Sequence, residues 1–352
     1  MIPIQTETIA LSISRGIDFL EQRQKSQGDF SCVIADNEAL TQNPREDPSP
    51  FFTQHILASL KEVAGPRAQN MSTKIRQFLL RDVCPGYIWK FWNKEHPQST
   101  LILPDVDDTS CIACLLEPAE FPSHQTRAML LGNRNSVGLF YTWILPRLRH
   151  LLRPQTWMPL YQNFKNPRNI INTIKFYRLL NNSDPFAVDT VVNANAVLFL
   201  GESSATKPAI NWICQVVATA TEASTDRWYQ SKYPLYYAIA RCKQSGVNGF
   251  DHIIPILTER LKVEIDAFGA CNNKVLDTAL AANVLASFQP SCRQLDQAVE
   301  FLLSNQQPNG GWPISVFFHD GFNPRVSFGS AEMVTAMCLE ALSKFTKTRF
   351  SD

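Results

Sequence analysis

The chain has 352 residues, of which 45% are hydrophobic and 18% are charged, and its formal net charge is +1. This length allows one large domain or two ordinary ones with a sizeable core. The near-neutral balance and the lack of a basic run argue against a nucleic-acid binder. No apolar stretch approaches the roughly 18 residues of a membrane-spanning helix, and the first residues lack the basic region and apolar block of a signal peptide. We therefore expect a cytoplasmic protein.

In chain order, helical periodicity dominates and strand alternation is scarce. Helices are predicted at residues 8–25, 51–63, 70–82, 107–117, 168–181, 187–200, 208–222, 233–243, 252–264, 275–288, 293–305 and 329–344. Residues 118–167, which are rich in proline and aromatic side chains, have the least regular pattern. We interpret this stretch as an irregular insertion in a chain that otherwise alternates helix with helix.

The more apolar helices share a beginning that recurs along the chain. They open near Phe51, Asp107, Val188, Pro234, Leu276 and Phe328, and each then runs into small and aliphatic residues. Most openings are about 42 to 56 residues apart, and the insertion explains the one longer interval. Six helical hairpins with this spacing predict an all-α fold, a single-domain (α/α)6 barrel over 1–352 with apolar helices inside and amphipathic ones outside. An open solenoid is the alternative, and we prefer closure because neither end shows a polar capping repeat.

A second repeated pattern occupies the turns after the outer helices. Gln24-x-x-x-Gly28-x-Phe30 opens the chain, and Gln306-x-x-x-Gly310-x-Trp312 has the same offsets 282 residues later. Glycine allows a tight turn, while the ring covers a helix end and the Gln amide satisfies free backbone groups. We expect a structural role for this turn and no chemistry.

The nine cysteines are scattered singly on apolar faces, apart from Cys111-x-x-Cys114. That spacing suits a redox or metal pair, but no second pair accompanies it, and both residues lie in an apolar helical run. Ordinary buried thiols in a reducing cytoplasm are the better interpretation.

Three carboxylates fall within four positions at Asp105, Asp107 and Asp108, directly before an apolar run. Charges this close repel, and burying them is costly unless some stay protonated. Such a cluster serves as an acid, a metal site or a helix cap. Asp189-Thr190 and Asp277-Thr278 stand at the same helix openings as Asp108-Thr109, so Asp108 is expected to cap its helix in part.

These features together resemble the terpene cyclase and prenyltransferase superfamily. The Gln-x-x-x-Gly-x-aromatic turns are similar to its repeat, and Asp105-Val106-Asp107-Asp108-Thr109 is similar to the Asp-x-Asp-Asp motif of class II, protonation-initiated cyclases, which include squalene–hopene cyclases. The resemblance implies that Asp107 is the general acid and that Asp105 and Asp108 hold and tune it. Protonating an alkene or epoxide requires a carboxylic acid that is still protonated and faces a dry cavity, and neighbouring carboxylates raise the pKa of one member.

The chain departs from the family in two ways. Class II cyclases of this kind usually pair two α-barrel domains, whereas this chain has room for one, so a homodimer or a partner subunit remains an alternative. The zinc-binding protein prenyltransferases are the single-domain relatives, but Phe328-Gly329-Ser330-Ala331-Glu332 lacks their histidine and Leu276-Asp277-Thr278 lacks their cysteine. We therefore expect no metal cofactor, with Mg²⁺ as the alternative if the substrate carries a diphosphate.

Aromatic rings near helix openings and in loops are candidates for lining a carbocation cavity, because a ring face attracts a cation by about 0.5–2 kcal/mol. The candidate substrate-binding residues are Trp89, Trp92, Tyr141, Trp143, Asp189, Asn193, Tyr233 and Phe328. Asp189 and Asn193 lie one turn apart on an apolar helix, where a buried hydrogen-bond network is the equal alternative. His55 and His319 are within reach of the acid in this fold, although locally satisfied histidines are the simpler interpretation.

The leading hypothesis is a class II-type terpene cyclase that acts on a linear isoprenoid or isoprenoid diphosphate. A non-catalytic toroid that binds a lipid or a protein partner is the main alternative. A glycan-active enzyme is a weaker one, because its two carboxyls would have to face each other across a polar cleft. Contact with a membrane surface is left open, and no nucleic-acid partner is expected.

Overall fold

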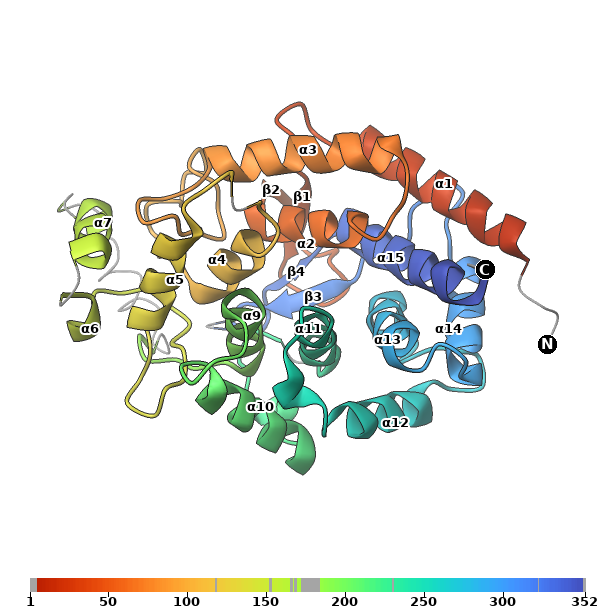
Figure 1. The fold of residues 1–352 in the computed structure, drawn as a ribbon. Helices are drawn as coiled ribbons and strands as arrows, with labels where there is room; N and C mark the ends of the chain where they lie inside the picture. The colour runs from red at the N-terminus through yellow and green to blue at the C-terminus, as the bar shows by residue number, and fades with distance from the viewer. Residues whose placement is uncertain are drawn as a thin grey trace.

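The computed structural model describes residues 5–117, 119–151, 154–164, 167, 170–171, 184–229, 231–321 and 323–350. The fold is mostly helical with one small sheet (Figure 1). The helix predicted at 168–181 lies almost wholly outside the described residues. Among the described helices, none is both long and apolar enough to cross a membrane.

Six buried helices form a closed ring in which each helix packs against the next and the last packs against the first. In order they are α2 (Pro50–Leu60), α4 (Val106–Ala113), α9 (Thr190–Leu200), α11 (Tyr233–Gln244), α13 (Val275–Phe288) and α15 (Ala331–Phe350). All six begin within a few residues of the predicted openings. No side of these helices is predominantly polar, because other parts of the chain cover each helix all round.

A second set of helices covers the ring from outside. These are α1 (Thr6–Arg23), α3 (Pro66–Arg81), α5 (Ser123–Gly132), α10 (Lys207–Thr219), α12 (Ile254–Glu264) and α14 (Arg293–Ser304). Each packs against an inner helix. On α14 the buried stripe is Leu295, Ala298, Val299 and Leu302, which is the one-sided pattern expected of an outer helix.

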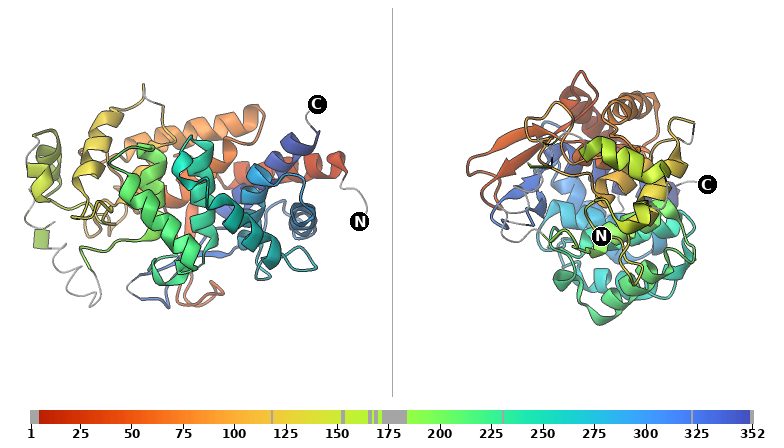
Figure 2. Two further views of the ribbon diagram at one scale, coloured as in Figure 1. Left: turned by 60° about the horizontal axis from the view of Figure 1, so that its bottom comes forward. Right: turned by 90° about the vertical axis from the view of Figure 1, so that its left-hand side faces the viewer.

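The described part of the segment expected to be irregular contains the helices α5, α6 (Leu148–Leu151) and α7 (Pro154–Phe164). Helix α5 takes an outer position against α4, while α6 and α7 stand beyond it to one side of the ring (Figure 2). Two single turns of 3-10 helix, Glu222–Ser224 and Asn248–Phe250, complete the helical elements of the described ranges.

An antiparallel sheet of four short strands was not predicted, so the all-α assignment was incomplete. The strands are β1 (Ser31–Ala35), β2 (Arg45–Pro48), β3 (Val316–His319) and β4 (Ser327–Gly329), in the order β2-β1-β4-β3. Pairing of β1 with β4 joins the first and last repeats, with Val33 opposite Gly329. Strands this short show no alternation that sequence periodicity can detect.

The repeated glutamine turns have the structural role expected of them. The amide of Gln306 donates to the carbonyls of Gly310 and Ser12, and the amide of Gln24 donates to those of Gly28 and Met71. Each amide therefore ties its own turn to the neighbouring outer helix. In the last repeat this link connects α1 to the turn after α14.

Candidate active site

The acidic stretch begins helix α4 and is held from two sides by backbone hydrogen bonds. Asp105 N–H donates to the carbonyl of Trp89, and Val106 N–H donates to that of Thr142. Asp105 is the N-cap residue, since its Oδ1 accepts the N–H of Asp108 at 2.7 Å. The cap expected at Asp108 is thus supplied by Asp105, because the N-cap side chain bonds an N–H two or three residues further on.

The element that the repeats share is the threonine rather than the aspartate. Thr109 Oγ1 accepts the N–H of Trp89 at 3.0 Å, and Thr335 Oγ1 accepts that of Trp312 at 3.1 Å. Thr278 makes the corresponding bond to Cys271 N–H at 2.9 Å. Each threonine fastens an inner helix to the turn that precedes it, so this part of the acidic motif is structural.

Asp107 is the carboxyl of the motif that accepts side-chain hydrogen bonds from α9 and from the loop before α11. Asn195 Nδ2, from α9, donates to its Oδ1 at 2.6 Å, and the Tyr229 hydroxyl, from the loop before α11, donates to its Oδ2 at 2.7 Å. The Cys111 thiol lies 3.9 Å from Oδ1, one turn along α4. Asp107 is buried, as are Asn195 and Tyr229. Both donors are uncharged, and the charge that favours ionisation of Asp107 comes from Arg241.

Burial raises the pKa of all three carboxyls of the motif, because the charged form loses its hydration. For Asp105 the pKa rises to about 7, with burial the main cause and the hydrogen bond to Asp108 acting against it. Burial raises the pKa of Asp108 well above its usual value, and the charge of Asp105 adds to this rise. Burial also raises the pKa of Asp107, while the bonds from Tyr229 and Asn195 lower it. The cluster therefore retains protons near neutral pH.

Asp226 positions Tyr229 and was missed by the sequence analysis. Its Oδ1 accepts the backbone N–H groups of Trp228 and Tyr229 at 3.0 Å, and its Oδ2 accepts that of Val191 at 3.0 Å. The same carboxyl thus begins α9 and fixes the loop that carries the Tyr229 hydroxyl. An Asp that bonds the N–H two residues later is an Asx turn, which was the available signal.

Aromatic rings gather beside Tyr229, mostly from the unpredicted sheet. Tyr229 contacts Phe317 with ring centroids 5.4 Å apart, and Phe318 stacks on Phe328 at 4.5 Å. Phe51 of α2 and Phe91 join the same cluster. Strands β3 and β4, which carry three of these rings, are seen through the middle of the ring of helices (Figure 1). The sheet therefore brings aromatic side chains to Tyr229, whose hydroxyl bonds Asp107.

Three of the candidate substrate-binding residues belong to this aromatic cluster or touch it. Phe328 stacks within it, and Trp143 contacts Trp228 at 5.9 Å, which in turn contacts Phe318 at 6.4 Å. Trp92 contacts Phe91 at 5.6 Å, edge to face, and also stacks on His96.

Other candidates are held by contacts away from Asp107. Trp89 donates its indole N–H to the carbonyl of Leu79 at 2.8 Å, and Trp312 makes the equivalent bond to Leu302, so Trp89 packs as a repeat residue. The ring of Tyr141 lies 4.1 Å from the Arg147 guanidinium carbon. Trp89 therefore links the outer helix α3 to the inner helix α4, and Tyr141 packs against residues of the loops outside the ring.

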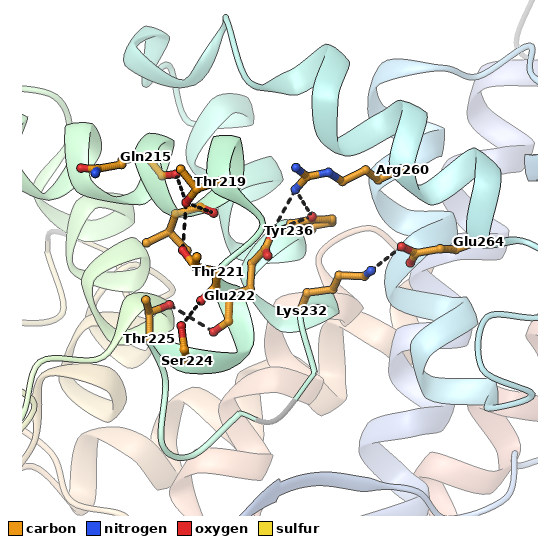
Figure 3. Close-up of polar contacts among 11 residues, drawn as sticks. Gln215, Thr219, Thr221, Glu222, Ser224, Thr225, Lys232, Tyr236, Arg260 and Glu264 are labelled. Carbon is orange, nitrogen blue, oxygen red and sulfur yellow. Dashed lines mark hydrogen bonds and ion pairs between the residues drawn. The ribbon is translucent and has the colours of Figure 1, made fainter.

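Tyr233 and Asn193 also bond elsewhere. The Tyr233 hydroxyl donates to Glu264 at 2.9 Å, and Glu264 pairs with Lys232 at the N-terminal end of α11 (Figure 3). Asn193 exchanges two hydrogen bonds with the backbone of Phe140, at 2.9 and 3.0 Å. Asn193 therefore belongs to a buried hydrogen-bond network, which was the alternative to lining a cavity.

Asp189 is held in that network as well. Its carboxylate accepts the Thr142 hydroxyl and the N–H of Arg227. Because Arg227 lies within the turn from Asp226 to Tyr229, Asp189 supports the loop that carries Tyr229. Burial raises the pKa of Asp189, and these hydrogen bonds lower it.

The two candidate histidines, His55 and His319, differ in their hydrogen bonding. His319 shares a hydrogen bond with Ser327, as a locally satisfied histidine would. Neither ring nitrogen of His55 has a partner within the described part of the chain, although the side chain is buried. For His55 the simpler interpretation was therefore wrong.

No metal-binding group of three or more His, Cys, Asp or Glu side chains occurs in the described ranges. The nine cysteines are free thiols; Cys111 lies near Asp107, and Cys114 accepts a weak contact from Arg241 at 3.6 Å. An open groove of about 700 Å³ lies between residues 83–87 and α7, and none of the acidic residues lines it.

No family model matches the chain, and no curated protein sequence does. Among solved structures, a protein from Actinoplanes matches with a TM-score of 0.73 and 16% identity over 96% of this chain and 99% of that one. The type II terpene cyclase MstE from Scytonema matches with a TM-score of 0.66 and 15% identity over 96% and 98%. A variant of MstE in complex with its substrate, geranylgeranyl dihydroxybenzoate, matches with a TM-score of 0.67. The resemblance noted in the sequence thus extends to the fold.

Proposed function

We propose that the chain is a class II-type terpene cyclase in which Asp107 protonates a terminal alkene or epoxide of a linear isoprenoid. One observation carries the proposal. Asp107 is a buried carboxyl whose pKa burial raises, and two neutral donors, Asn195 and Tyr229, bond its two oxygens at 2.6 and 2.7 Å. A retained proton together with a stabilised carboxylate after transfer is what a strong general acid requires.

The assignment of the acid to Asp107 rests on the different partners of the three carboxyls. Asp105 is occupied as the helix cap, and the carboxyls of Asp105 and Asp108 bond each other. Asn195 donates to Oδ1 of Asp107, so the transferable proton belongs on Oδ2, beside the Tyr229 hydroxyl. A hydroxyl can both donate and accept, so Tyr229 can hold that proton and then stabilise the anion left behind.

The rings beside Tyr229 supply the second requirement, which is a surface that favours carbocations without capturing them. Phe317, Phe318 and Phe328 offer ring faces or edges and no nucleophile. Each favourable ring contributes about 0.5–2 kcal/mol toward a cation. We take the closed ring of six helices as an (α/α)6 barrel formed by the single domain 1–352, with the reaction in its interior.

The proposed substrate class is a linear polyprenyl chain, and the substrate of the Scytonema cyclase is a guide to its size and head group. Asp107, Asn195 and Tyr229 all come from this chain, so the proposal needs no partner subunit. The motif's carboxyls do not fit Mg²⁺, since Asp105 is bound by a backbone N–H and bonds Asp108. No step is therefore assigned to a metal ion.

The test is Asp107→Asn, which keeps the size of the side chain and removes the proton. We expect cyclised product from squalene, geranylgeranyl diphosphate or a prenylated aromatic acid to fall by about 10²–10⁴-fold, the usual value of a general acid. Asp277→Asn is the matched control, because Asp277 is a carboxyl at another inner helix opening, bonded by Asn272 rather than by Tyr229. A folded Asp107→Asn variant with unchanged product formation would refute the proposal, and binding without conversion by the native chain would favour a non-catalytic lipid binder.

A further inference from the structure

Two adjacent side chains of α2, Gln54 and His55, are buried without hydrogen-bond partners among the described residues. Both amide atoms of Gln54 and both ring nitrogens of His55 are unpaired. Leaving a buried polar group unpaired costs about 1–3 kcal/mol. Asn193 and Asn195, at similar depth on α9, do have partners. Within the described residues, unpaired buried atoms also occur on α4 and α13, at Asp108, Ser110 and Asn283, so His55 is set apart by the groups that surround its ring.

His55 faces the same interior wall as the acid. Its ring lies edge to face against Phe51 at 4.8 Å and against Phe317 at 4.9 Å. Phe317 contacts the ring of Tyr229, whose hydroxyl holds Asp107. One phenylalanine ring therefore separates the imidazole from the tyrosine that bonds the acid. The imidazole is framed by rings that would also surround a hydrocarbon substrate.

The surroundings keep His55 neutral. Burial lowers the pKa of His55 well below its usual value, and the positive charge of Arg241 on α11 lowers it further. The same Arg241 lowers the pKa of Asp107, so its charge acts on both groups. A neutral imidazole has one nitrogen lone pair that can accept a proton. A weak base is sufficient here, because a C–H bond next to a carbocation is strongly acidic.

We propose that His55 is the base that ends the reaction, an inference that rests on the proposed cyclase function. Its free ring nitrogen takes the proton from the carbon next to the last carbocation, and the electron pair of that C–H bond becomes the double bond of the product. Asp107 has given one proton at the start and His55 receives one at the end, so substrate and product are isomers. The charge of Arg241 disfavours the imidazolium, which gives its proton to water, and Asp107 regains one from water before the next turnover.

The experiment compares products rather than rates. His55→Phe removes the base and keeps an aromatic ring, while His55→Ala leaves space that free imidazole can fill. We expect both variants to consume substrate within about tenfold of the native rate, since protonation by Asp107 is untouched. Their products should shift several-fold from the native alkene toward water-captured alcohols or alkenes with the double bond elsewhere. Added imidazole should return His55→Ala toward the native product ratio.

Gln54→Leu is the matched control, because it removes the other unpaired polar group of α2 and leaves the base in place. It should keep the native product ratio. An unchanged ratio in both His55 variants, or an equal shift in Gln54→Leu, overturns the inference while leaving Asp107 as the acid. If the native chain converts no isoprenoid, the proposed function itself fails. The melting temperature of each variant is measured first, so that a lost fold is recognised.

Discussion

At the scale of single residues, the three aspartates of one helical turn have three different surroundings. Asp105 accepts a backbone N–H and begins α4, Asp108 faces Asp105 and has an unpaired Oδ1 in the described structure, and Asp107 is bonded by Asn195 and Tyr229. Spacing alone cannot separate these roles, since the partners of Asp107 come from 88 and 122 residues away. Chemistry at this site depends on which donors the fold brings to which carboxyl.

Tyr229→Phe tests whether the hydroxyl tunes the acid. Its bond to Asp107 lowers the pKa of that carboxyl, so its loss should raise the pKa. The alkaline limb of kcat/KM should then move to higher pH, and the rate at neutral pH should fall by about 10–100-fold because the carboxylate formed is less stabilised. Tyr237→Phe is the control, since that buried hydroxyl bonds Glu340 instead. An alkaline limb that stays in place in Tyr229→Phe contradicts the role.

Residue-level prediction from the sequence succeeded where a pattern was local. The acidic stretch could be recognised at the opening of its helix because its residues are contiguous. Asn195 is a polar residue on an otherwise apolar helix, but its partner depends on how α9 packs against α4. Asp226 was missed because its function is to bond backbone N–H groups of a loop, which leaves only a weak signal in composition.

At the scale of elements, the inner helices were predictable, whereas the sheet and the helices α5, α6 and α7 were not. Inner helices are apolar on all sides and outer helices have one buried stripe, so their sequences differ in a way that periodicity detects. Strand β2, with the sequence Arg-Glu-Asp-Pro, has no apolar face, and it exists because it pairs with β1. The strands that deliver Phe317, Phe318 and Phe328 to the site therefore depend on contacts between the two ends of the chain.

The turn after α14 is an element whose contribution can be measured. Gly310 has a φ of +88°, and a Cβ there would lie 2.3 Å from the carbonyl oxygen of Arg15. Gly310→Ala should therefore lower the free energy of unfolding by the cost of positive φ plus that of a backbone clash, together well above about 1 kcal/mol. Gly246→Ala is the control, since Gly246 has a φ of +90° and open space around its Cβ position. Equal losses in urea unfolding would show that the contact with α1 contributes nothing.

At the scale of the whole molecule, closure of the ring concentrates buried carboxyls that retain protons. Burial raises the pKa of Asp105, Asp107, Asp108, Asp189 and Asp226 in the folded chain. Glu340 is the opposite case, because Lys344 lowers its pKa against the effect of burial, and its contribution is lost only in acid below pH 4.5. Through these five carboxyls the folded chain binds more protons than the unfolded chain above that pH, while the buried His55, whose pKa is lowered, acts in the opposite direction.

The contribution of these carboxyls to stability should consequently fall as pH rises. A carboxyl whose folded pKa exceeds its unfolded value stabilises the fold fully below the unfolded pKa and loses that contribution as pH passes the folded pKa. For Asp105 these values are 3.8 and about 7, so the free energy of unfolding should decrease between them. Asp105→Asn keeps the helix cap, because Asn caps as well as Asp, and should flatten the slope measured by urea unfolding at several pH values. Asp18→Asn, at an exposed pair with Arg67, should leave it unchanged. If the slope is the same in Asp105→Asn as in the native chain, Asp105 does not retain a proton in the folded state and the prediction is wrong.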